Sequence, residues 1–415
     1  MTILIKNIKT LYGIREQENG AIRGKSLNSI NTLNDAWLLI LDGIIADYGT
    51  MSNTDAWQNL SLTNLIDASG KLIIPCFVDS HTHIVFAKTR ESEFVDRING
   101  LTYEEIAANG GGILNSSAKL HLSSEDELFN TAWSRLKKCI KNGTGAIEIK
   151  SGYGLSVEDE LKMLRVIKRL KTVSPIPIKA TFLGAHAIPL IYKNNRAEYI
   201  HLICDEMLPL LAKEELADYC DVFCDSGFFT PEETDLILKK AKTFGLKPKI
   251  HANELGLTGG VQVGVLNEAI SVDHLEHTSN IEHDILYNSN TMATMLPSTA
   301  FFLGIPYPDA RAMINADLAL CLASDYNPGS SPSGRMSFIL SLACIRMKMT
   351  PTEALNAATI NGAYALELEN ICGSITKGKL ANLILTQTAE NIDLIPYNFG
   401  EDLIEHVFIK GEIFE

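Results

Sequence analysis

Histidines and carboxylates that follow apolar, strand-like runs are the residues of this 415-residue chain best suited to chemistry. His81 and His83 stand two positions apart, and on a strand that spacing points both imidazoles to one side, where they can reach one metal ion. His251 offers a third nitrogen and Asp325 an oxygen. Three histidines and one aspartate suit Zn²⁺ or Fe²⁺ and leave room for a water, so the sequence predicts one divalent metal held by these four residues.

A metal site of this kind suits hydrolysis of an amide-like C–N bond, because a divalent metal lowers the pKa of water and generates a nucleophile. The reaction also needs a base for the proton of the water and an acid for the leaving nitrogen. Glu254 and His274 are predicted for those roles, beside Asp325. The alternatives are a solvated loop carboxylate for Glu254 and a partner that orients Asp325 for His274. Lys150, after another apolar run, is either a site cation or a buried ion-pair partner.

These residues need a scaffold that brings distant segments of the chain to one point. The middle of the chain alternates β-rich apolar runs with amphipathic helical stretches, which is typical of parallel strands joined by crossover helices. Eight such runs can be counted: LIIPCFVDSHTH, GAIEIKSG, KATFLGAH, CDVFCD, KPKIHANE, SVDHLEH, TMATMLPS and LALCLASD. The active site of a (β/α)8 barrel lies at the carboxyl ends of its strands, where these candidates stand, so we predict an α/β fold with a TIM-like barrel.

Both ends of the chain differ from the middle, because short apolar strands and turns replace the helical pattern there. Residues 38–49, LLILDGIIADYG, and 373–386, GSITKGKLANLILT, are examples. We predict a small β-sandwich domain built from residues 1–70 and 369–415, around a barrel of residues 71–368. Capping-box patterns, threonine with glutamate three residues on, predict helix starts at Thr102, Thr230 and Thr350.

Composition narrows the possible partners. The 36 Lys+Arg against 50 Asp+Glu give a net charge of −14, which opposes binding to nucleic acid or to an anionic membrane surface. No apolar run approaches the roughly 20 residues that span a bilayer, and the first residues lack a signal-peptide pattern, so we expect a cytoplasmic protein. Eight scattered cysteines without a CxxC pair predict buried thiols rather than a zinc knuckle or a disulfide framework.

A family resemblance rests on motifs that surround these candidates. The motifs, in chain order, are VDSHTHIVFAKTRESEF, YEEIAANGGGI, IEIKSGYGL, TFLGAHAIP, HANE, DHLEH and SDYNPGSSP. The HTH at 81–83 with the later histidines and aspartate resembles the amidohydrolase superfamily, which includes many deaminases and cyclic-amide hydrolases. The order and spacing of the full set resemble more narrowly the imidazolonepropionases of histidine degradation, over nearly the whole chain.

The resemblance implies residue roles and a reaction. Family metal ligands fall on His81, His83, His251 and Asp325, and family substrate contacts fall on Arg90, Tyr153, His186, Glu254, Asn327, Gly329 and Ser330. The implied reaction is hydrolysis of 4-imidazolone-5-propanoate to N-formimidoyl-L-glutamate. Arg90 would bind the substrate carboxylate through a planar, two-pronged contact, and His186 would be a donor to the oxyanion. A homodimer is expected, and zinc and iron both stay open as the metal.

Three alternative functions fit the sequence less well. A binuclear cyclic-amide hydrolase needs a lysine at the end of the fourth strand, where the chain has Cys224 and Asp225. A mononuclear aminohydrolase acting on a purine or pyrimidine ring shares the ligand set, but it would not need Arg90 or the KSGYG segment. A barrel that binds a ligand without catalysis is disfavoured, because every ligand, base and acid candidate is present.

Overall fold

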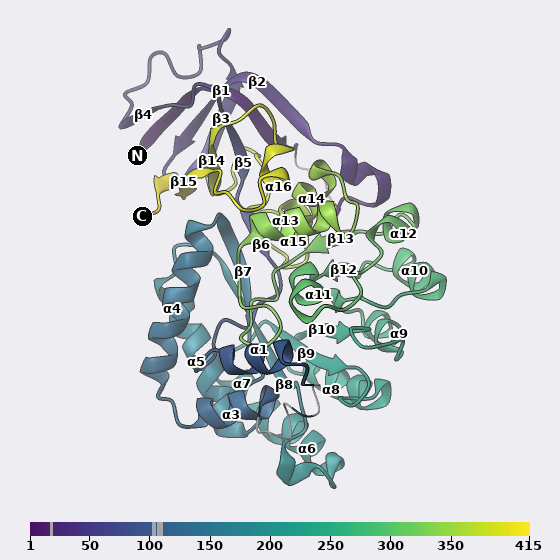
Figure 1. The fold of residues 1–415 in the computed structure, drawn as a ribbon. Helices are drawn as coiled ribbons and strands as arrows, with labels where there is room; N and C mark the ends of the chain where they lie inside the picture. Colours follow the sequence, from purple (N-terminus) through teal and green to yellow (C-terminus); the bar gives the residue numbers. More distant parts are fainter. Residues whose placement is uncertain (17–19, 102–104, 106–110) are drawn as a thin grey trace.

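The fold consists of two β-sheets and the helices that cover one of them (Figure 1). The computed structural model describes residues 1–16, 20–101, 105 and 111–415, so the predicted helix start at Thr102 lies outside the described residues. Strands from both ends of the chain form the first sheet, which lies at the top of Figure 1, where purple and yellow segments meet. The second sheet is formed by the middle of the chain.

The first sheet has eight strands in the order β16-β15-β14-β5-β1-β2-β3, with β4 paired to β1. Its strands are β1 Thr2–Ile14, β2 Asn31–Leu41, β3 Ile44–Thr50, β4 Asn64–Asp67, β5 Lys71–Pro75, β14 Leu383–Thr388, β15 Ile404–Ile409 and β16 Glu412–Ile413. Residues 71–75 therefore pair in this sheet, although they fall on the barrel side of the predicted domain boundary at 70/71. The predicted domain boundaries at 70/71 and 368/369 stay predictions. A separate core of residues such as Ile5, Leu38 and Phe408 fills the small domain.

The second sheet is the predicted barrel of eight parallel strands, in the order β13-β12-β11-β10-β9-β8-β7-β6. Its strands are β6 Phe77–Asp79, β7 Thr144–Lys150, β8 Ile178–Ala185, β9 Tyr219–Cys224, β10 Lys247–Ala252, β11 Ser271–His274, β12 Met292–Met295 and β13 Leu320–Leu322. Each of the eight runs counted in the sequence overlaps one of these strands. The sequence prediction of an α/β fold with a TIM-like barrel is confirmed.

The barrel closes where the segments after β6 and β13 pair. Thr82 and Tyr326 form a parallel bridge, Asp325 N donates to His81 O at 3.0 Å, and His83 N donates to Tyr326 O at 2.9 Å. Because the first and last strands meet at this seam, two histidines near residue 80 lie beside an aspartate more than 240 positions later in the chain. Closure of the barrel therefore assembles part of the site.

Helices cover the outside of the barrel, and most of them follow one strand and precede the next. They are α1 Glu91–Ile98, α3 Gly112–His121, α4 Glu125–Lys141, α5 Val157–Val173, α6 Arg196–His201, α7 Leu208–Lys213, α8 Pro231–Lys242, α9 Gly260–Leu266, α10 Asn280–Tyr287, α11 Pro297–Leu303, α12 Ala310–Asn315, α13 Met336–Ile345, α14 Pro351–Ala358, α15 Ile360–Tyr364 and α16 Leu394–Tyr397, with short η1 Gly24–Asn28, η2 Leu190–Tyr192 and η3 Leu202–Met207. The predicted capping boxes at Thr230 and Thr350 begin α8 and α14.

Strand β7 shows how the sequence divides barrel interior from exterior. Side chains alternate along a strand, so Ile147 and Ile149 pack in the apolar core while Glu148 and Lys150 form an ion pair with each other. All four residues are buried.

Among the residues that the structure describes, no helix is long and apolar enough to cross a membrane.

Candidate metal-dependent active site

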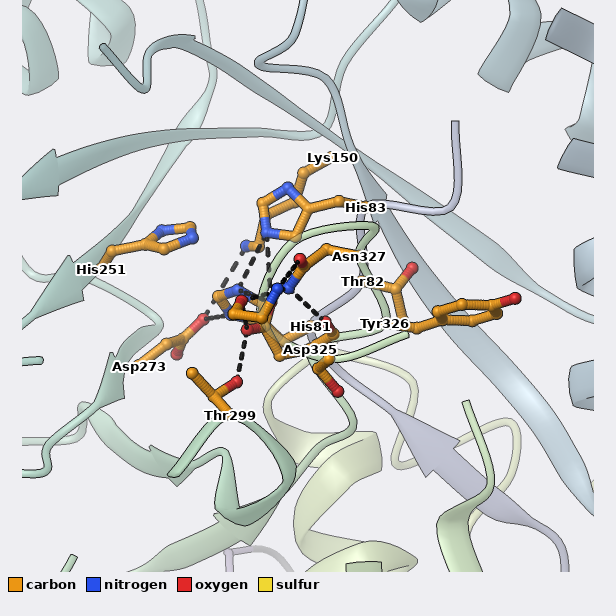
Figure 2. A network of polar contacts seen from close by, with 12 residues as sticks. His81, Thr82, His83, Lys150, His251, Asp273, Thr299, Asp325, Tyr326 and Asn327 are labelled. Atoms are coloured by element: carbon orange, nitrogen blue, oxygen red, sulfur yellow. Dashed lines mark hydrogen bonds and ion pairs between the residues drawn. The ribbon is translucent and has the colours of Figure 1, made fainter. Parts of the chain in front are cut away.

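Three side chains at the closing seam converge on one point (Figure 2). His81 Nε2 lies 3.3 Å from His83 Nε2, and Asp325 Oδ1 lies 3.6 Å from the first nitrogen and 3.5 Å from the second. Ligands about 2.0–2.1 Å from a tetrahedral Zn²⁺ are about 3.3–3.4 Å apart, so these separations fit three ligands of one metal ion. Lone pairs this close repel one another unless a cation or a proton lies between them. The donor set therefore fits a divalent metal.

Both imidazoles have the protonation state that a metal ligand needs. Burial and neighbouring positive charges hold the pKa of His81 and of His83 well below the ordinary value, so each ring is neutral. His81 Nδ1 is 2.6 Å from Asp273 Oδ2, and a proton on Nδ1 leaves the lone pair of Nε2 for the metal. Thr299 Oγ1 donates to Asp325 Oδ2 at 2.6 Å, which leaves Oδ1 facing the histidines. Asp273 and Thr299 are not among the residues predicted from the sequence.

His251 belongs to a second, overlapping group. His81, His251 and His274 each offer a ligand atom within 4.8 Å of the others, as do His81, His83 and Asp325. His251 Nδ1 lies 3.0 Å from Asp221 Oδ2, so an aspartate also accompanies this histidine. His81 is common to both groups, and the four predicted ligands come together at one end of the barrel. Their assignment to one metal stays a prediction.

Beneath these ligands the barrel holds a buried group of charges. Lys150 Nζ is 2.8 Å from both Glu148 Oε1 and Asp221 Oδ2, and 3.8 Å from Asp273 Oδ2. Lys249 Nζ is 3.1 Å from Glu148 Oε2 and 3.7 Å from Asp273 Oδ2. All five side chains are fully buried. Of the two interpretations of Lys150, the buried ion-pair partner is the one its contacts favour.

A cavity of about 470 Å³ opens beside the predicted metal ligands. It is lined by all but one of the predicted site residues, namely His83, Arg90, Tyr153, His186, His251, Glu254, His274, Asp325, Asn327, Gly329 and Ser330. His81 lies just behind the wall and is fully buried. The remaining lining is largely apolar and includes Phe223 and Phe228, whose rings stack with centroids 4.0 Å apart. The cavity therefore offers apolar walls with convergent polar groups, as small-molecule sites do.

Arg90 supplies a positive charge in this cavity. Its guanidinium is buried, Nε donates to Ser116 Oγ at 2.8 Å, and Nη1 lies 4.0 Å from Glu93 Oε2. Nη2 has no hydrogen-bond partner among the described residues. Its Cζ lies 5.8 Å from the ring centroid of Tyr153. A buried guanidinium with a donor to spare is suited to an anionic ligand.

The loop after Asp325 packs against this arginine. Asn327 Oδ1 accepts from Gly329 N at 2.7 Å and from Ser330 N at 2.8 Å, while Nδ2 donates to Asp325 O and to Ser330 Oγ. The Asn327 amide therefore organises the loop. A side chain on Gly329 would run into Arg90, because a Cβ there would lie 3.1 Å from Cζ and closer still to Nη1. Any side chain at this position would therefore displace the guanidinium of Arg90.

His186 is neutral and has a defined tautomer. Its Nδ1 lies 2.9 Å from the carbonyl oxygen of Gly152, to which it donates, and burial together with neighbouring His251 lowers its pKa to about 3. Its other ring nitrogen, Nε2, is then an acceptor. The ring also stacks on His83 at a centroid distance of 5.5 Å. This geometry favours a contact with an N–H group over the oxyanion-donor role predicted from the sequence.

Glu254 and His274 form an acid–base pair on the cavity wall. His274 Nε2 lies 3.7 Å from Glu254 Oε2, and Nδ1 lies 3.6 Å from Glu276 Oε2. Burial raises the pKa of Glu254 above its ordinary value, although the charge of His274 opposes this. Burial lowers the pKa of His274, but the carboxylates of Glu254 and Glu276 outweigh burial and raise it. The imidazole is thus the cation of the pair; Glu276 was not identified from the sequence.

Comparisons with known proteins agree with this fold and site. The amidohydrolase family model matches residues 72–414, and the chain belongs to that family. Curated imidazolonepropionases from Flavobacterium johnsoniae and Christiangramia forsetii are 54% and 52% identical over 413 residues, which cover 100% of this chain and of each relative. Within the amidohydrolases, the chain therefore belongs with the imidazolonepropionases.

A solved relative shows the same fold at low identity. The adenosine deaminase of Xanthomonas campestris, solved with bound zinc, has a TM-score of 0.71 and 14% identity, covering 99% of this chain and 92% of its own. This likeness supports the fold alone. It does not favour the alternative of a deaminase, because the imidazolonepropionases are so much more similar in sequence.

Proposed function

We propose that the protein hydrolyses 4-imidazolone-5-propanoate to N-formimidoyl-L-glutamate, opening the ring at its amide C–N bond in histidine degradation. The name shared by the full-length relatives supports this substrate. The observation that carries it in the structure is the buried guanidinium of Arg90, which has an unused donor at Nη2 in a cavity beside the metal ligands. The propanoate carboxylate of the substrate would accept from Arg90. A neutral purine or pyrimidine has no carboxylate to accept from the Nη2 donor of Arg90.

The proposed cofactor is one divalent metal, zinc or iron, held by His81, His83, His251 and Asp325. When bound, it would polarise the ring carbonyl and lower the pKa of a water. The ligand set supports either metal, because imidazole and carboxylate bind both. Metal analysis of the purified protein would identify which one the chain carries.

The residues of the chain suggest how protons move. We propose Glu254 as the base that takes a proton from the attacking water, since a carboxylate with a raised pKa binds that proton well near neutral pH. His274, as the cation, would stabilise the negative charge that develops on the carbonyl oxygen. His186 would accept from a ring N–H and so orient the substrate. Protonated Glu254 could then return its proton to the leaving ring nitrogen.

Turnover of freshly generated 4-imidazolone-5-propanoate, followed as loss of its ultraviolet absorbance, tests this function. We expect rapid loss with about one metal per chain. Arg90→Met should retain the metal and weaken substrate binding. The matched control is Arg335→Met, because Arg335 is not among the cavity-lining residues and donates to Glu401 O instead. No loss in a metal-loaded wild-type sample would refute the proposed substrate. A homodimer and a cytoplasmic location also stay proposals, which sedimentation and cell fractionation test.

A further inference from the structure

Glu276 is a buried carboxylate whose presence needs an explanation. Its side chain is fully shielded from solvent, and neither of its carboxylate oxygens has a hydrogen-bond partner among the described residues. Carboxylates are seldom buried without partners, because removal from water is costly unless a cation or donors replace the solvent. The polar group beside it is the imidazole of His274, whose Nδ1 lies 3.6 Å from Oε2. No other ion pair of Glu276 occurs among the described residues.

The backbone brings this carboxylate to His274 by an unusual turn. His274 and Leu275 have φ values of 89° and 66°, a left-handed conformation that non-glycine residues seldom adopt. The turn is fixed to the end of β10, because Leu275 N donates to Ala252 O at 3.1 Å and His277 N donates to Asn253 O at 2.9 Å. Strained residues of this kind persist where the surrounding structure enforces them, and they cluster at functional sites. Because of this turn, the side chain of Glu276 lies next to the imidazole ring of His274.

The two ring nitrogens of His274 consequently face two different carboxylates. Nε2 faces Glu254, which lines the cavity, and Nδ1 faces Glu276, which is not among the cavity-lining residues. A carboxylate behind an imidazole fixes the orientation of the ring, as in carboxylate–histidine pairs at other catalytic sites. The sequence DHLEH thus contains both the imidazole and its support.

We propose that Glu276 is a positioning residue for the reaction, which holds the imidazole of His274 so that Nε2 points at Glu254 and at the reacting carbonyl. Glu276 acts through His274 and makes no contact with substrate. The inference rests on the proposed hydrolysis, but the contact between Glu276 and His274 can be tested separately.

A double-mutant cycle distinguishes positioning from a purely structural role. We expect Glu276→Gln to lower kcat by about 10- to 100-fold, with KM and metal content unchanged. In a His274→Asn background the same change should alter kcat by less than about two-fold, because its target is gone. The matched control is Glu282→Gln, which alters a buried carboxylate at the start of α10 that faces Ser279 and Gln262 instead. It should lower kcat little and equally in both backgrounds.

Equal losses from Glu276→Gln in both backgrounds, or loss of metal from that variant, would overturn the proposal. Histidine labelled with ¹⁵N provides a readout that does not depend on turnover of His274→Asn. In the zinc-loaded protein, Glu276→Gln should shift the Nδ1 resonance of His274, whereas Glu282→Gln should leave it in place. An unmoved Nδ1 resonance would also overturn the inference. Failure of the wild type to hydrolyse the imidazolone would instead refute the proposed function, and the resonance would still report the contact.

Discussion

Replacement of Gly329 by alanine tests carboxylate recognition without touching the arginine itself. The backbone φ of Gly329 is not in the left-handed region, so alanine fits the backbone, and the only new group is one methyl. That methyl would lie 3.1 Å from Arg90 Cζ and nearer to Nη1, inside normal contact distance. The guanidinium cannot retreat freely, since its Nε donates to Ser116 Oγ at 2.8 Å. We therefore expect the Nη groups to rotate out of line with the substrate carboxylate.

The size of the effect follows from what is lost. A hydrogen bond to a charged group contributes about 1.5–3 kcal/mol, and each 1.4 kcal/mol is about tenfold in affinity. Gly329→Ala should therefore lower kcat/KM for 4-imidazolone-5-propanoate by about 10- to 150-fold, chiefly through KM. Metal content should not change, because Gly329 contacts none of the predicted ligands. The control is Gly400→Ala, where a Cβ meets nothing within 4 Å and φ is ordinary.

A second substrate separates the arginine from the loop. An imidazolone with a neutral side chain in place of propanoate should be turned over slowly and equally by the wild type and by Gly329→Ala. An unchanged KM for the anionic substrate would show that Arg90 does not bind its carboxylate in this position. An equal loss with both substrates would show that the methyl disturbs the Asn327–Ser330 loop instead.

Further predictions concern the groups around the metal ligands. Asp273→Asn should weaken metal binding by about 10- to 100-fold, measured by competition with a chelator. The reason is that an amide accepts the Nδ1 proton of His81 less strongly than the carboxylate does. An unchanged metal affinity would show that Asp273 does not orient His81 for the metal. Lys150→Met should lower the free energy of unfolding, measured in urea, by about 3–5 kcal/mol, because it leaves buried carboxylates unpaired. The control is Lys239→Met, which removes an exposed ion pair and should lower the free energy of unfolding by at most about 1 kcal/mol. Because its pKa is raised, Glu254 becomes protonated at a pH above the ordinary glutamate range. A protonated Glu254 cannot act as a base, so kcat/KM should fall as the pH drops toward that range. Glu254→Gln should bind metal without turnover at any pH. A pH profile that is flat through this region would contradict the assignment.

The barrel could be predicted from the sequence because its signals are local. Each parallel strand is a short apolar run, and capping boxes such as Thr230 with Glu233 mark where the next helix begins. The candidate metal ligands could be picked out for the same reason, since polar residues at strand ends interrupt an apolar pattern. Strand β5 was placed with the barrel because its apolar run continues into β6, and only pairing with β1 and β14 separates the two.

The supporting residues could not be assigned in this way, because their roles depend on which distant segment lies opposite. Asp221 and Asp273 are charged residues inside apolar strands, which was a usable signal, but their partners are His251 on β10 and His81 just after β6. Thr299 lies on α11 and reaches Asp325 only in the folded barrel. For Glu276, the left-handed turn at His274 and Leu275 decides the direction of the side chain, and no propensity predicts that conformation for these residue types.

The charges at the bottom of the site give an independent reason to expect a divalent ion. The buried group contains the carboxylates of Glu148, Asp221 and Asp273 and the ammonium groups of Lys150 and Lys249, all within ion-pair distance of a partner. Three negative and two positive formal charges leave one negative charge, and Asp325 adds a second beside the neutral imidazoles of His81 and His83. Uncompensated charge is costly in a buried position. A divalent cation at the seam would balance the formal charges of these six side chains.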